Sequence, residues 1–266
     1  MNKIHQTAVI ETGAELGDGV EVGPFSVIGP NVSLSDGTKL YSHVVVSGHT
    51  EVGANTHIFP FASIGHQPQD LKFQGEISNL KIGANNIIRE HVTINPGTEG
   101  GGLLTEIGNN CLFMVGSHVA HDCKIGNHVV LANNATLAGH VVLEDFVILG
   151  GLSAVHQFVR IGRHAMVGGM SGVEQDIIPY GSALGNRARM SGLNIVGLKR
   201  RGFSRTEVAN LRKAYRLLFA EEGTLSERME DVSEMYSDNE PVMDIIAFIR
   251  KESSRAICQP RTANGT

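Results

Sequence analysis

The amino-acid sequence predicts a mainly β fold, a parallel β-solenoid of about 180 residues followed by a small α-helical domain. Three observations support this prediction. An aliphatic residue recurs at every sixth position, two insertions interrupt the repeat, and the apolar spacing becomes helical toward the end of the chain. A helix with 3.6 residues per turn cannot keep a six-residue repeat on one face, whereas short strands joined by tight corners each send one aliphatic side chain inward.

The aliphatic repeat covers residues 10–64, 82–94 and 107–173 without a miss. It keeps its phase across the first insertion and shifts by one residue at the second. Glycine often follows the aliphatic residue directly, for example at Gly23 and Gly53. We attribute these glycines to corners that need unusual backbone angles.

Helix-start signals follow the repeat. The motifs SRTE at residues 204–207 and TLSE at residues 224–227 have the capping-box pattern. We expect the first helix to last until Gly223 and the second to end near Tyr236. Pro241 is suited to the first turn of a third helix.

These patterns divide the chain into two domains. We place the β-solenoid in residues 1–186, with loop insertions near 66–79 and 95–106, and the C-terminal helical domain in residues 187–266. An exposed solenoid end needs a cap, and we expect the helices to supply it.

The composition narrows the class of protein. The chain has 266 residues, 41% of them apolar, and a net charge of -5, which excludes a disordered protein. Its mild acidity argues against a nucleic-acid partner. The N-terminus lacks a signal-peptide pattern, and no apolar stretch is long enough to span a membrane, so we expect a cytoplasmic protein without stable membrane insertion. The three cysteines are expected to be buried free thiols.

Positive charge is concentrated in residues 187–216, where nine Lys or Arg residues stand against one acid, a local net charge of +8. Within it, Lys199, Arg200 and Arg201 are adjacent. Guanidinium groups are well shaped to bind a diphosphate, and such a run also suits an acidic protein partner. A solvated basic face is the competing interpretation.

Four of the twelve histidines fall in one stretch of the repeat: His118, His121, His140 and His156. Asp122, beside His121, is placed to orient an imidazole that acts as a general base. The backbone N–H of Gly139 is placed to stabilise a developing oxyanion. No recognised nucleophile motif lies beside them, which favours direct proton abstraction over a covalent intermediate. Ordinary surface imidazoles are the alternative.

The first insertion carries Asp70 and Lys72, a carboxylate and an ammonium suited to a polar substrate. Solvated loop charges are the alternative interpretation.

Five segments resemble the UDP-N-acetylglucosamine O-acyltransferases, hexapeptide-repeat enzymes that catalyse the first step of lipid A biosynthesis. They are GHQPQDLK, SHVAHDCKIGN, LANNATLAGHV, GGLSAVHQFVRIG and NIVGLKRRGFS. The resemblance covers nearly the whole chain and is weakest after Gly223. It implies a left-handed parallel β-helix with three strands per coil, a C-terminal helical domain, and a homotrimer with active sites between subunits.

Three strands per coil imply 18 residues per coil. Val119, Leu137 and Val155 then become stacked neighbours, about 4.8 Å apart per coil. His121 and His140, together with His156 of the next coil, are then expected to project near one edge of the solenoid.

The resemblance also implies the reaction, the transfer of a 3-hydroxyacyl chain from acyl-carrier protein to the 3-hydroxyl of the glucosamine unit of UDP-N-acetylglucosamine. His121 is then the general base, Asp122 orients it, and the Gly139 N–H serves the oxyanion. The acyl donor is carried on 4'-phosphopantetheine, and no metal or redox cofactor is required.

The remaining substrate-binding residues follow from the same resemblance. Those expected to bind or position the sugar nucleotide and acyl chain are Asp70, Lys72, His118, His140, His156 and Gln157. Those expected to face the UDP portion and the phosphopantetheine arm are Asn194, Arg200 and Arg201. Gly169 matches the position that limits acyl length in the family, and its lack of a side chain predicts a relatively long acyl chain.

The sequence departs from the family pattern at Asn95, Arg187 and Val196, where His, His and Glu are common. The changes at Asn95 and Val196 leave open an acceptor with a 3-amino group. Clustered imidazoles on a β-helix also suit zinc, as in gamma-class carbonic anhydrases, although the ligand spacing here differs.

Overall fold

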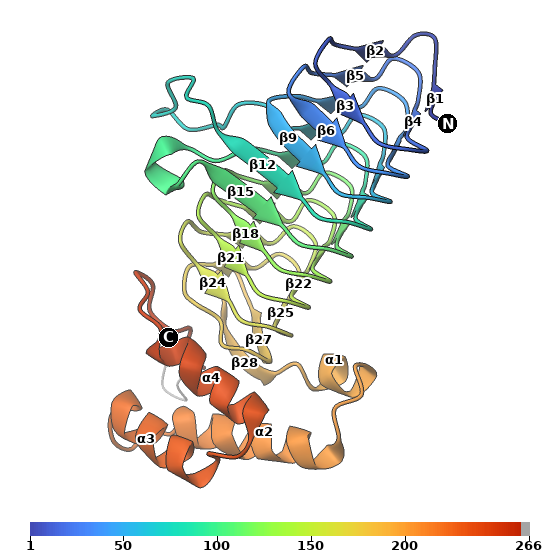
Figure 1. Ribbon diagram of the computed structural model, residues 1–266. Helices are drawn as coiled ribbons and strands as arrows, with labels where there is room; N and C mark the ends of the chain where they lie inside the picture. Colours follow the sequence, from blue (N-terminus) through green and yellow to red (C-terminus); the bar gives the residue numbers. More distant parts are fainter. Residues whose placement is uncertain (262–266) are drawn as a thin grey trace.

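The six-residue repeat folds into a left-handed parallel β-helix, as seen in a computed structural model that describes residues 1–261. Each coil contributes one short strand to each of three sheets, A, B and C (Figure 1). Val119 pairs with Leu137, and Leu137 pairs with Val155, so the coil length of 18 residues is confirmed for these coils.

The strands are listed here by sheet, in the order in which they stack. Sheet A contains β1 (Lys3–Ile4), β4 (Glu21–Val22), β7 (Lys39–Leu40), β10 (His57–Ile58), β13 (Ile87–Ile88), β16 (Leu112–Phe113), β19 (Val130–Leu131), β22 (Ile148–Leu149), β25 (Met166–Val167), β27 (Gly181–Leu184) and β28 (Arg189–Leu193). Sheet B contains β2 (Val9–Ile10), β5 (Val27–Ile28), β8 (Val45–Val46), β11 (Ser63–Ile64), β14 (Thr93–Ile94), β17 (His118–Val119), β20 (Thr136–Leu137), β23 (Ala154–Val155) and β26 (Gly172–Val173). Sheet C contains β3 (Glu15–Leu16), β6 (Val32–Leu34), β9 (His49–Val52), β12 (Asn79–Ile82), β15 (Leu104–Ile107), β18 (Lys124–Ile125), β21 (Val142–Leu143) and β24 (Arg160–Ile161).

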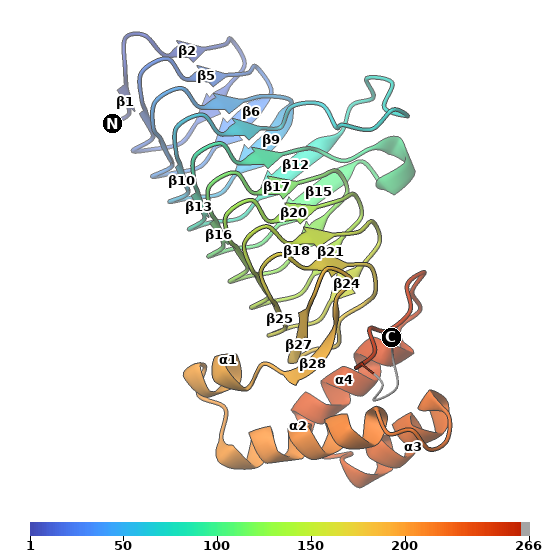
Figure 2. The same ribbon diagram turned by 180° about the vertical axis from the view of Figure 1, so that it is seen from behind.

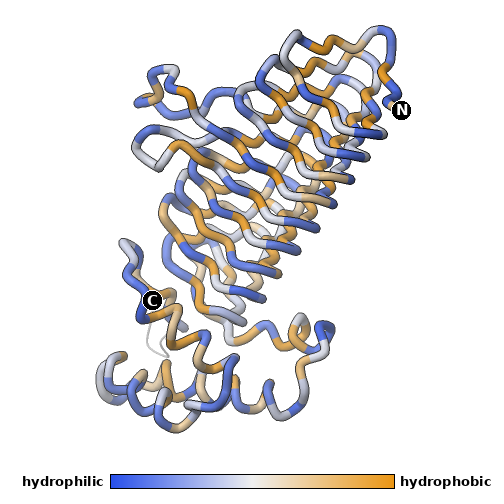
Figure 3. Tube along the Cα trace, viewed as in Figure 1, coloured by the Kyte–Doolittle hydropathy of each residue, from blue (hydrophilic) through white to orange (hydrophobic). Residues whose placement is uncertain are grey.

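The repeated aliphatic residues form a continuous core inside the coils. Ile28, Ile88 and Leu137 have no exposed surface, and their outward-facing neighbours in the strands are more exposed. Figure 3 shows hydrophobic segments recurring from coil to coil, with a row of hydrophilic corners along the right edge. Burial of one aliphatic side chain per strand stabilises a fold whose strands are mostly two residues long.

The reason given above for the glycines is wrong. Gly23 and Gly53 do not have positive φ angles. A Cβ at either position would instead lie 2.7 Å or 2.5 Å from a backbone carbonyl carbon of the next coil. Glycine is therefore needed there because the coils approach closely. The left-handed residues stand three positions after the aliphatic residue and include His43 and Asn85 as well as glycines.

Aromatic and imidazole rings stack in columns at these left-handed corners. In one column His128 stacks on Phe146 at 4.6 Å between ring centroids, and Phe146 stacks on His164 at 4.7 Å. Tyr180 continues the column at 5.6 Å from His164. Burial lowers the pKa of His164 to about 4, and the charges of Arg201 and Arg163 act in the same direction. The column therefore contains a neutral imidazole at pH 7.

Both insertions leave the solenoid between sheet B and sheet C. The first joins β11 to β12, and the second joins β14 to β15 through a short 3-10 helix, η1 (Glu99–Gly101). They project from the same side of the β-helix (Figures 1 and 2). The Gly97 N–H donates to the carbonyl of Asn79, and the Glu99 N–H donates to the carboxylate of Glu76. The two loops therefore support each other.

Four helices follow the last coil: α1 (Ile195–Arg200), α2 (Arg205–Leu218), α3 (Leu225–Met235) and α4 (Glu240–Arg250). Both expected capping boxes form, and Pro241 lies in the first turn of α4. Helix α2 ends at Leu218 rather than at Gly223, because the Leu218 carbonyl accepts a hydrogen bond from the Arg228 side chain instead of continuing the helix. The sequence did not predict α1.

The junction between solenoid and helices lies close to residue 186. That residue falls between β27 and β28, which pair antiparallel, so sheet A continues to Leu193 before α1 begins. Residues 262–266 of the expected helical domain lie outside the described residues.

The helical domain covers the end of the solenoid. The Arg160 guanidinium donates to the Asp176 carboxylate at 2.8 Å and lies 4.5 Å from the centre of the Phe248 ring on α4. The chain after α4 returns to the last coil, where Cys258 is buried. Cys111 and Cys123 are also buried free thiols, as expected. Within residues 1–261, no helix combines the length and apolar character needed to cross a membrane.

Two adjacent residues of β13 test the inward-facing repeat. Ile88 is fully buried, whereas Ile87 is 43% exposed. We expect Ile88→Ala to lower the free energy of unfolding by about 2–5 kcal/mol, because it leaves a cavity in the core. Ile87→Ala is the matched control and should lower it by less than half as much. Denaturant unfolding of both variants measures the difference, and equal losses would contradict the assigned faces.

Candidate active site

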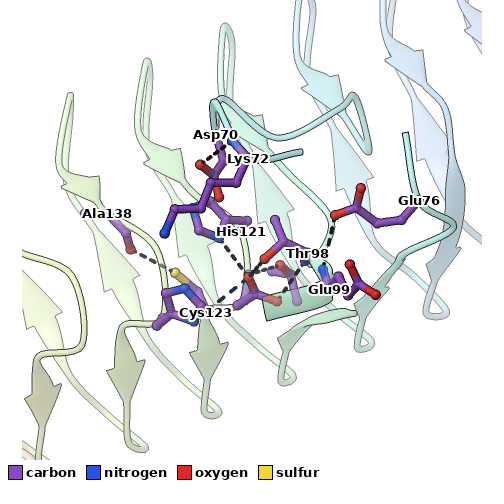
Figure 4. A network of polar contacts seen from close by, with 11 residues as sticks. Asp70, Lys72, Glu76, Thr98, Glu99, His121, Cys123 and Ala138 are labelled. Atoms are coloured by element: carbon purple, nitrogen blue, oxygen red, sulfur yellow. Dashed lines mark hydrogen bonds and ion pairs between the residues drawn. The ribbon is translucent and has the colours of Figure 1, made fainter. Parts of the chain in front are cut away.

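His121 and Asp122 lie at the corner between sheets B and C, directly below the two insertions (Figure 4). They follow Val119 by two and three positions, and Asp122 occupies the left-handed position with a φ of 60°. This backbone conformation turns the carboxylate toward the preceding side chain. His121 Nδ1 lies 2.7 Å from Asp122 Oδ2, and both side chains are buried. The pairing expected from the sequence is therefore present.

The second insertion holds the Asp122 carboxylate in place. Thr98 donates to it twice, from Oγ1 to Oδ2 at 2.6 Å and from its backbone N–H to Oδ1 at 2.9 Å (Figure 4). The Asp122 N–H in turn donates to Thr105 Oγ1 at 2.8 Å. The sequence analysis missed Thr98, because a threonine inside a glycine-rich loop carries no signal of what it contacts.

Two glycines of that loop make room for the carboxylate. A Cβ at Gly101 would lie 1.9 Å from Asp122 Cγ, and a Cβ at Gly97 would lie 2.8 Å from Oδ1. The neighbouring Gly100 has nothing within 4 Å of its ideal Cβ. The run GTEGGG therefore contains glycines with different functions, and only the contacts distinguish them.

Gly139 faces the His121 ring from the next coil. A Cβ at Gly139 would lie 2.4 Å from His121 Cε1 and 2.6 Å from Nε2. Within residues 1–261 the Gly139 N–H finds no hydrogen-bond acceptor. The structure thus places an uncommitted donor beside the imidazole and shows why residue 139 has no side chain.

His140 and His118 flank the pair. The His140 ring lies at a right angle to His121, 5.1 Å between centroids, and stacks on Phe158 at 4.4 Å. Burial lowers the pKa of His140, although the Asp122 carboxylate opposes the shift. Burial also lowers the pKa of His118, whose Nδ1 lies 2.7 Å from Thr93 Oγ1. Both imidazoles are therefore neutral at pH 7.

His156 lies at the same corner but does not share these contacts. It follows its aliphatic residue by one position, whereas His121 follows by two and His140 by three. Side chains at different positions of successive coils do not stack directly. His156 instead contacts Arg255 and is exposed, as is the adjacent Gln157.

The first insertion brings two charges to this corner. Asp70 Oδ1 accepts the Lys72 N–H at 3.0 Å, which shapes the tip of the loop. The charges of both residues influence His140, Asp70 raising its pKa and Lys72 lowering it. The loop is held to the solenoid by Asn95, whose Nδ2 donates to the carbonyl of His66 at 3.0 Å. Among the described residues Asn95 Oδ1 has no hydrogen-bond partner, although it is buried.

Asn194, Arg200 and Arg201 lie elsewhere. They belong to α1 and its ends, on the side of the molecule opposite the insertions (Figures 1 and 2). Asn194 caps α1 by accepting the Gly197 N–H and also donates to the His164 carbonyl. Arg201 donates to the Phe146 carbonyl at 3.1 Å, and Arg200 is exposed. One chain therefore does not bring these residues to His121.

The other residues singled out from the sequence have simple surroundings. Gly169 lies over Gly151 of the preceding coil, with an ideal Cβ 3.2 Å from its carbonyl oxygen. Val196 is 62% exposed on α1, and Arg187 forms an ion pair with Glu174.

His121, Asp122 and His140 each offer one potential metal ligand atom, and these atoms lie within 4.8 Å of one another. Asp122 Oδ2 is already engaged by His121 and Thr98. The Cys123 thiol, although adjacent, is fully buried, and burial raises its pKa to about 12. It is therefore a poor nucleophile at neutral pH.

Two family profiles match the chain. One, described as Udp N-acetylglucosamine O-acyltransferase, domain 2, matches residues 176–258. The other, described as bacterial transferase hexapeptide, six repeats, matches residues 104–139. The first covers the end of the solenoid and the helices, and the second covers the coils that carry His121.

Relatives of nearly equal length are similar throughout. An acyl-(acyl-carrier-protein)-UDP-N-acetylglucosamine O-acyltransferase of Caulobacter vibrioides is 54% identical over 257 residues, 97% of this chain and 98% of the relative. One of the same name from Bartonella bacilliformis is 50% identical over 264 residues, 99% of this chain and 96% of the relative.

Solved structures give the same result for the fold. A crystal structure of a UDP-N-acetylglucosamine acyltransferase has a TM-score of 0.94 at 46% identity and covers 98% of this chain and 100% of its own. A UDP-N-acetylglucosamine O-acyltransferase from Moraxella catarrhalis has a TM-score of 0.93 at 40% identity, covering 96% and 99%.

Adjacent glycines of the second insertion test how Asp122 is held. We expect Gly101→Ala to displace the carboxylate and lower kcat about tenfold to a hundredfold, because a small misplacement of a catalytic pair is costly. Gly100→Ala, with open space at its Cβ, should leave kcat within twofold. Acyl transfer by both purified variants is the measurement, and equal rates would show that the loop does not position Asp122.

Proposed function

Because this chain belongs to the UDP-N-acetylglucosamine O-acyltransferase family, as its 54% identity over nearly the full length of a relative shows, we propose that His121 is the general base of its reaction. The enzyme transfers an acyl group from acyl-carrier protein to UDP-N-acetylglucosamine, the first step of lipid A biosynthesis. The observation that carries the proposal is the 2.7 Å contact between His121 Nδ1 and a carboxylate fixed by Thr98.

This contact sets the tautomer of His121. Asp122 accepts hydrogen bonds from Thr98, so its oxygen acts as an acceptor toward Nδ1–H of the imidazole. The lone pair of the neutral ring then lies on Nε2. An imidazole in this form accepts a proton from a hydroxyl group and later returns it.

The proposed chemistry is direct acyl transfer. His121 Nε2 takes the proton of the glucosamine 3-hydroxyl while the oxygen attacks the thioester carbonyl of a 3-hydroxyacyl chain. The negative charge that develops on the carbonyl oxygen is stabilised by the Gly139 N–H. The carbon–sulfur bond then breaks, and the imidazolium returns the proton to the departing thiolate of 4'-phosphopantetheine. The high pKa of Cys123 supports a route without an acyl-cysteine intermediate.

Substrate binding is assigned to the groups around this pair. Asp70 and Lys72 on the loop, with His118, His140, His156 and Gln157 on the solenoid, bind or position the sugar nucleotide and the acyl chain. The neutral state of His118 and His140 supports roles in hydrogen bonding rather than in binding negative charge. The proposal invokes no metal or cofactor of the protein itself.

A homotrimer with sites between subunits is part of the proposal. Asn194, Arg200 and Arg201 are expected to face the UDP portion and the phosphopantetheine arm, yet α1 lies away from His121 within one chain. A second copy that brings its α1 region to this corner would complete the site. We also place the reaction in the cytoplasm.

The comparisons favour the acyltransferase over the zinc enzyme, because the relatives of nearly equal length are acyltransferases. They also favour a hydroxyl acceptor over a 3-amino group, because the relatives are O-acyltransferases. Asn95 supports this reading, since its Nδ2 is used to hold the first insertion.

The general base is tested by His121→Ala. We expect kcat/KM to fall by about a thousandfold, because the hydroxyl loses its proton acceptor. The assay measures transfer from 3-hydroxyacyl-carrier protein to UDP-N-acetylglucosamine and to its 3-amino analogue, with the hydroxyl acceptor preferred by the wild type. His5→Ala, an exposed histidine in the first coil, is the control and should be fully active. A nearly active His121→Ala protein would overturn the assignment.

The acyl-length assignment is tested at Gly169. The wild type should prefer a relatively long 3-hydroxyacyl chain. Gly169→Met should shift the preference to shorter chains, because the new side chain occupies space that the acyl tail needs. Competition between carrier proteins loaded with different chain lengths measures the preference, with thermal unfolding as the control for folding. An unchanged preference would place the acyl tail elsewhere.

A further inference from the structure

The segment after α4 forms part of the corner that carries His156. It rises beside the last coils on the side where the insertions project (Figures 1 and 2). Its backbone is held on both sides of Asp176, whose N–H donates to the Ala256 carbonyl at 2.9 Å and whose carbonyl accepts the Cys258 N–H at 2.8 Å. The segment is therefore fixed to the solenoid by a short stretch of parallel pairing.

Arg255 uses this anchoring to reach His156. Its Nε donates to the Gln157 carbonyl at 2.9 Å, and its Nη2 lies 2.6 Å from His156 Nδ1. The two contacts orient the guanidinium plane against the corner. His156 Nδ1 also lies 3.4 Å from the Gln157 carbonyl, which is a much longer contact.

The short contact decides which ring nitrogen carries the proton. A guanidinium group only donates hydrogen bonds, so Nδ1 must present its lone pair to Arg255. If Nδ1 carried a proton, two donors would face each other at 2.6 Å and gain only the weak 3.4 Å contact in return. The proton of the neutral His156 ring therefore resides on Nε2.

We propose that Arg255 is a positioning residue of the acyl-transfer site, which holds His156 as the Nε2–H tautomer so that its exposed ring donates a hydrogen bond to an oxygen of the bound substrate. The inference rests on the proposed function, which places His156 and Gln157 in the substrate site. It gives His156 the opposite role to His121, whose Nδ1–H faces a carboxylate and whose Nε2 is free to accept a proton.

The kinetic test is a double-mutant cycle on the full-length enzyme. We expect Arg255→Met to lower kcat/KM for UDP-N-acetylglucosamine about tenfold, since one well-oriented hydrogen bond is lost. His156→Ala should lower it at least as much, and the double variant should be no worse than His156→Ala alone. Losses that multiply would show that Arg255 does not act through His156 and would overturn the proposal.

Two further variants sharpen the cycle. Lys251→Met makes the same kind of change at an exposed position of the same segment and should leave kcat/KM unchanged. Arg255→Lys keeps a donor without the fork and should recover part of the activity. A loss as large in Lys251→Met as in Arg255→Met would reveal a general disturbance of the segment and count against the proposal.

The tautomer is measured directly by NMR of protein labelled with 15N in its histidine rings, with His156 assigned from the spectrum of His156→Gln. We expect a protonated Nε2 and an unprotonated Nδ1 in the wild type, and a mixture in Arg255→Met. A protonated Nδ1 in the wild type would overturn the proposal even if Arg255→Met failed to fold. This readout does not depend on catalysis, whereas an active His121→Ala protein would contradict only the general-base assignment.

Discussion

The stacking of each coil on the next, at the spacing of a parallel β-sheet, is the constraint on which the rest of the structure depends. Two side chains meet only when they hold equivalent positions in neighbouring coils. His121 and Gly139 do so, and the imidazole therefore occupies the space that a side chain at residue 139 would need. The second insertion leaves the solenoid at the same corner one coil earlier, which brings Thr98 within reach of Asp122.

The same side chain performs different tasks at this corner because its Nδ1 has different partners. A carboxylate faces His121, and a guanidinium group faces His156. One contact leaves a lone pair for a proton, and the other leaves an N–H for an oxygen. His140 has neither partner at hydrogen-bond distance, since its Nδ1 lies 3.9 Å from Asp122, and its stacking on Phe158 fixes the ring instead. The chemistry of each imidazole thus follows from its neighbours.

The sequence was sufficient to predict whatever depends on periodicity. The coil repeat, the two insertions and the capping boxes at Ser204 and Thr224 all recur in the structure, because each is a local pattern with a fixed spacing. The adjacent pair of His121 and Asp122 was also predictable from adjacency. Thr98 and Arg255 were not, because they reach the site from a loop and from the segment after α4, at separations in sequence that no spacing rule connects. The use of glycine for close approach rather than for backbone angle likewise required knowledge of the next coil.

The columns of stacked rings have a consequence for how such a chain changes over generations. His128, Phe146 and His164 touch one another across intervals of 18 residues and are far apart along the chain. A change in the size of one ring is felt first by the rings on either side of it in the column, so the mutations that restore the fit arise one coil away rather than at adjacent codons. The inherited sequence is therefore edited along columns, and its history is best followed by aligning the coils of the protein with one another.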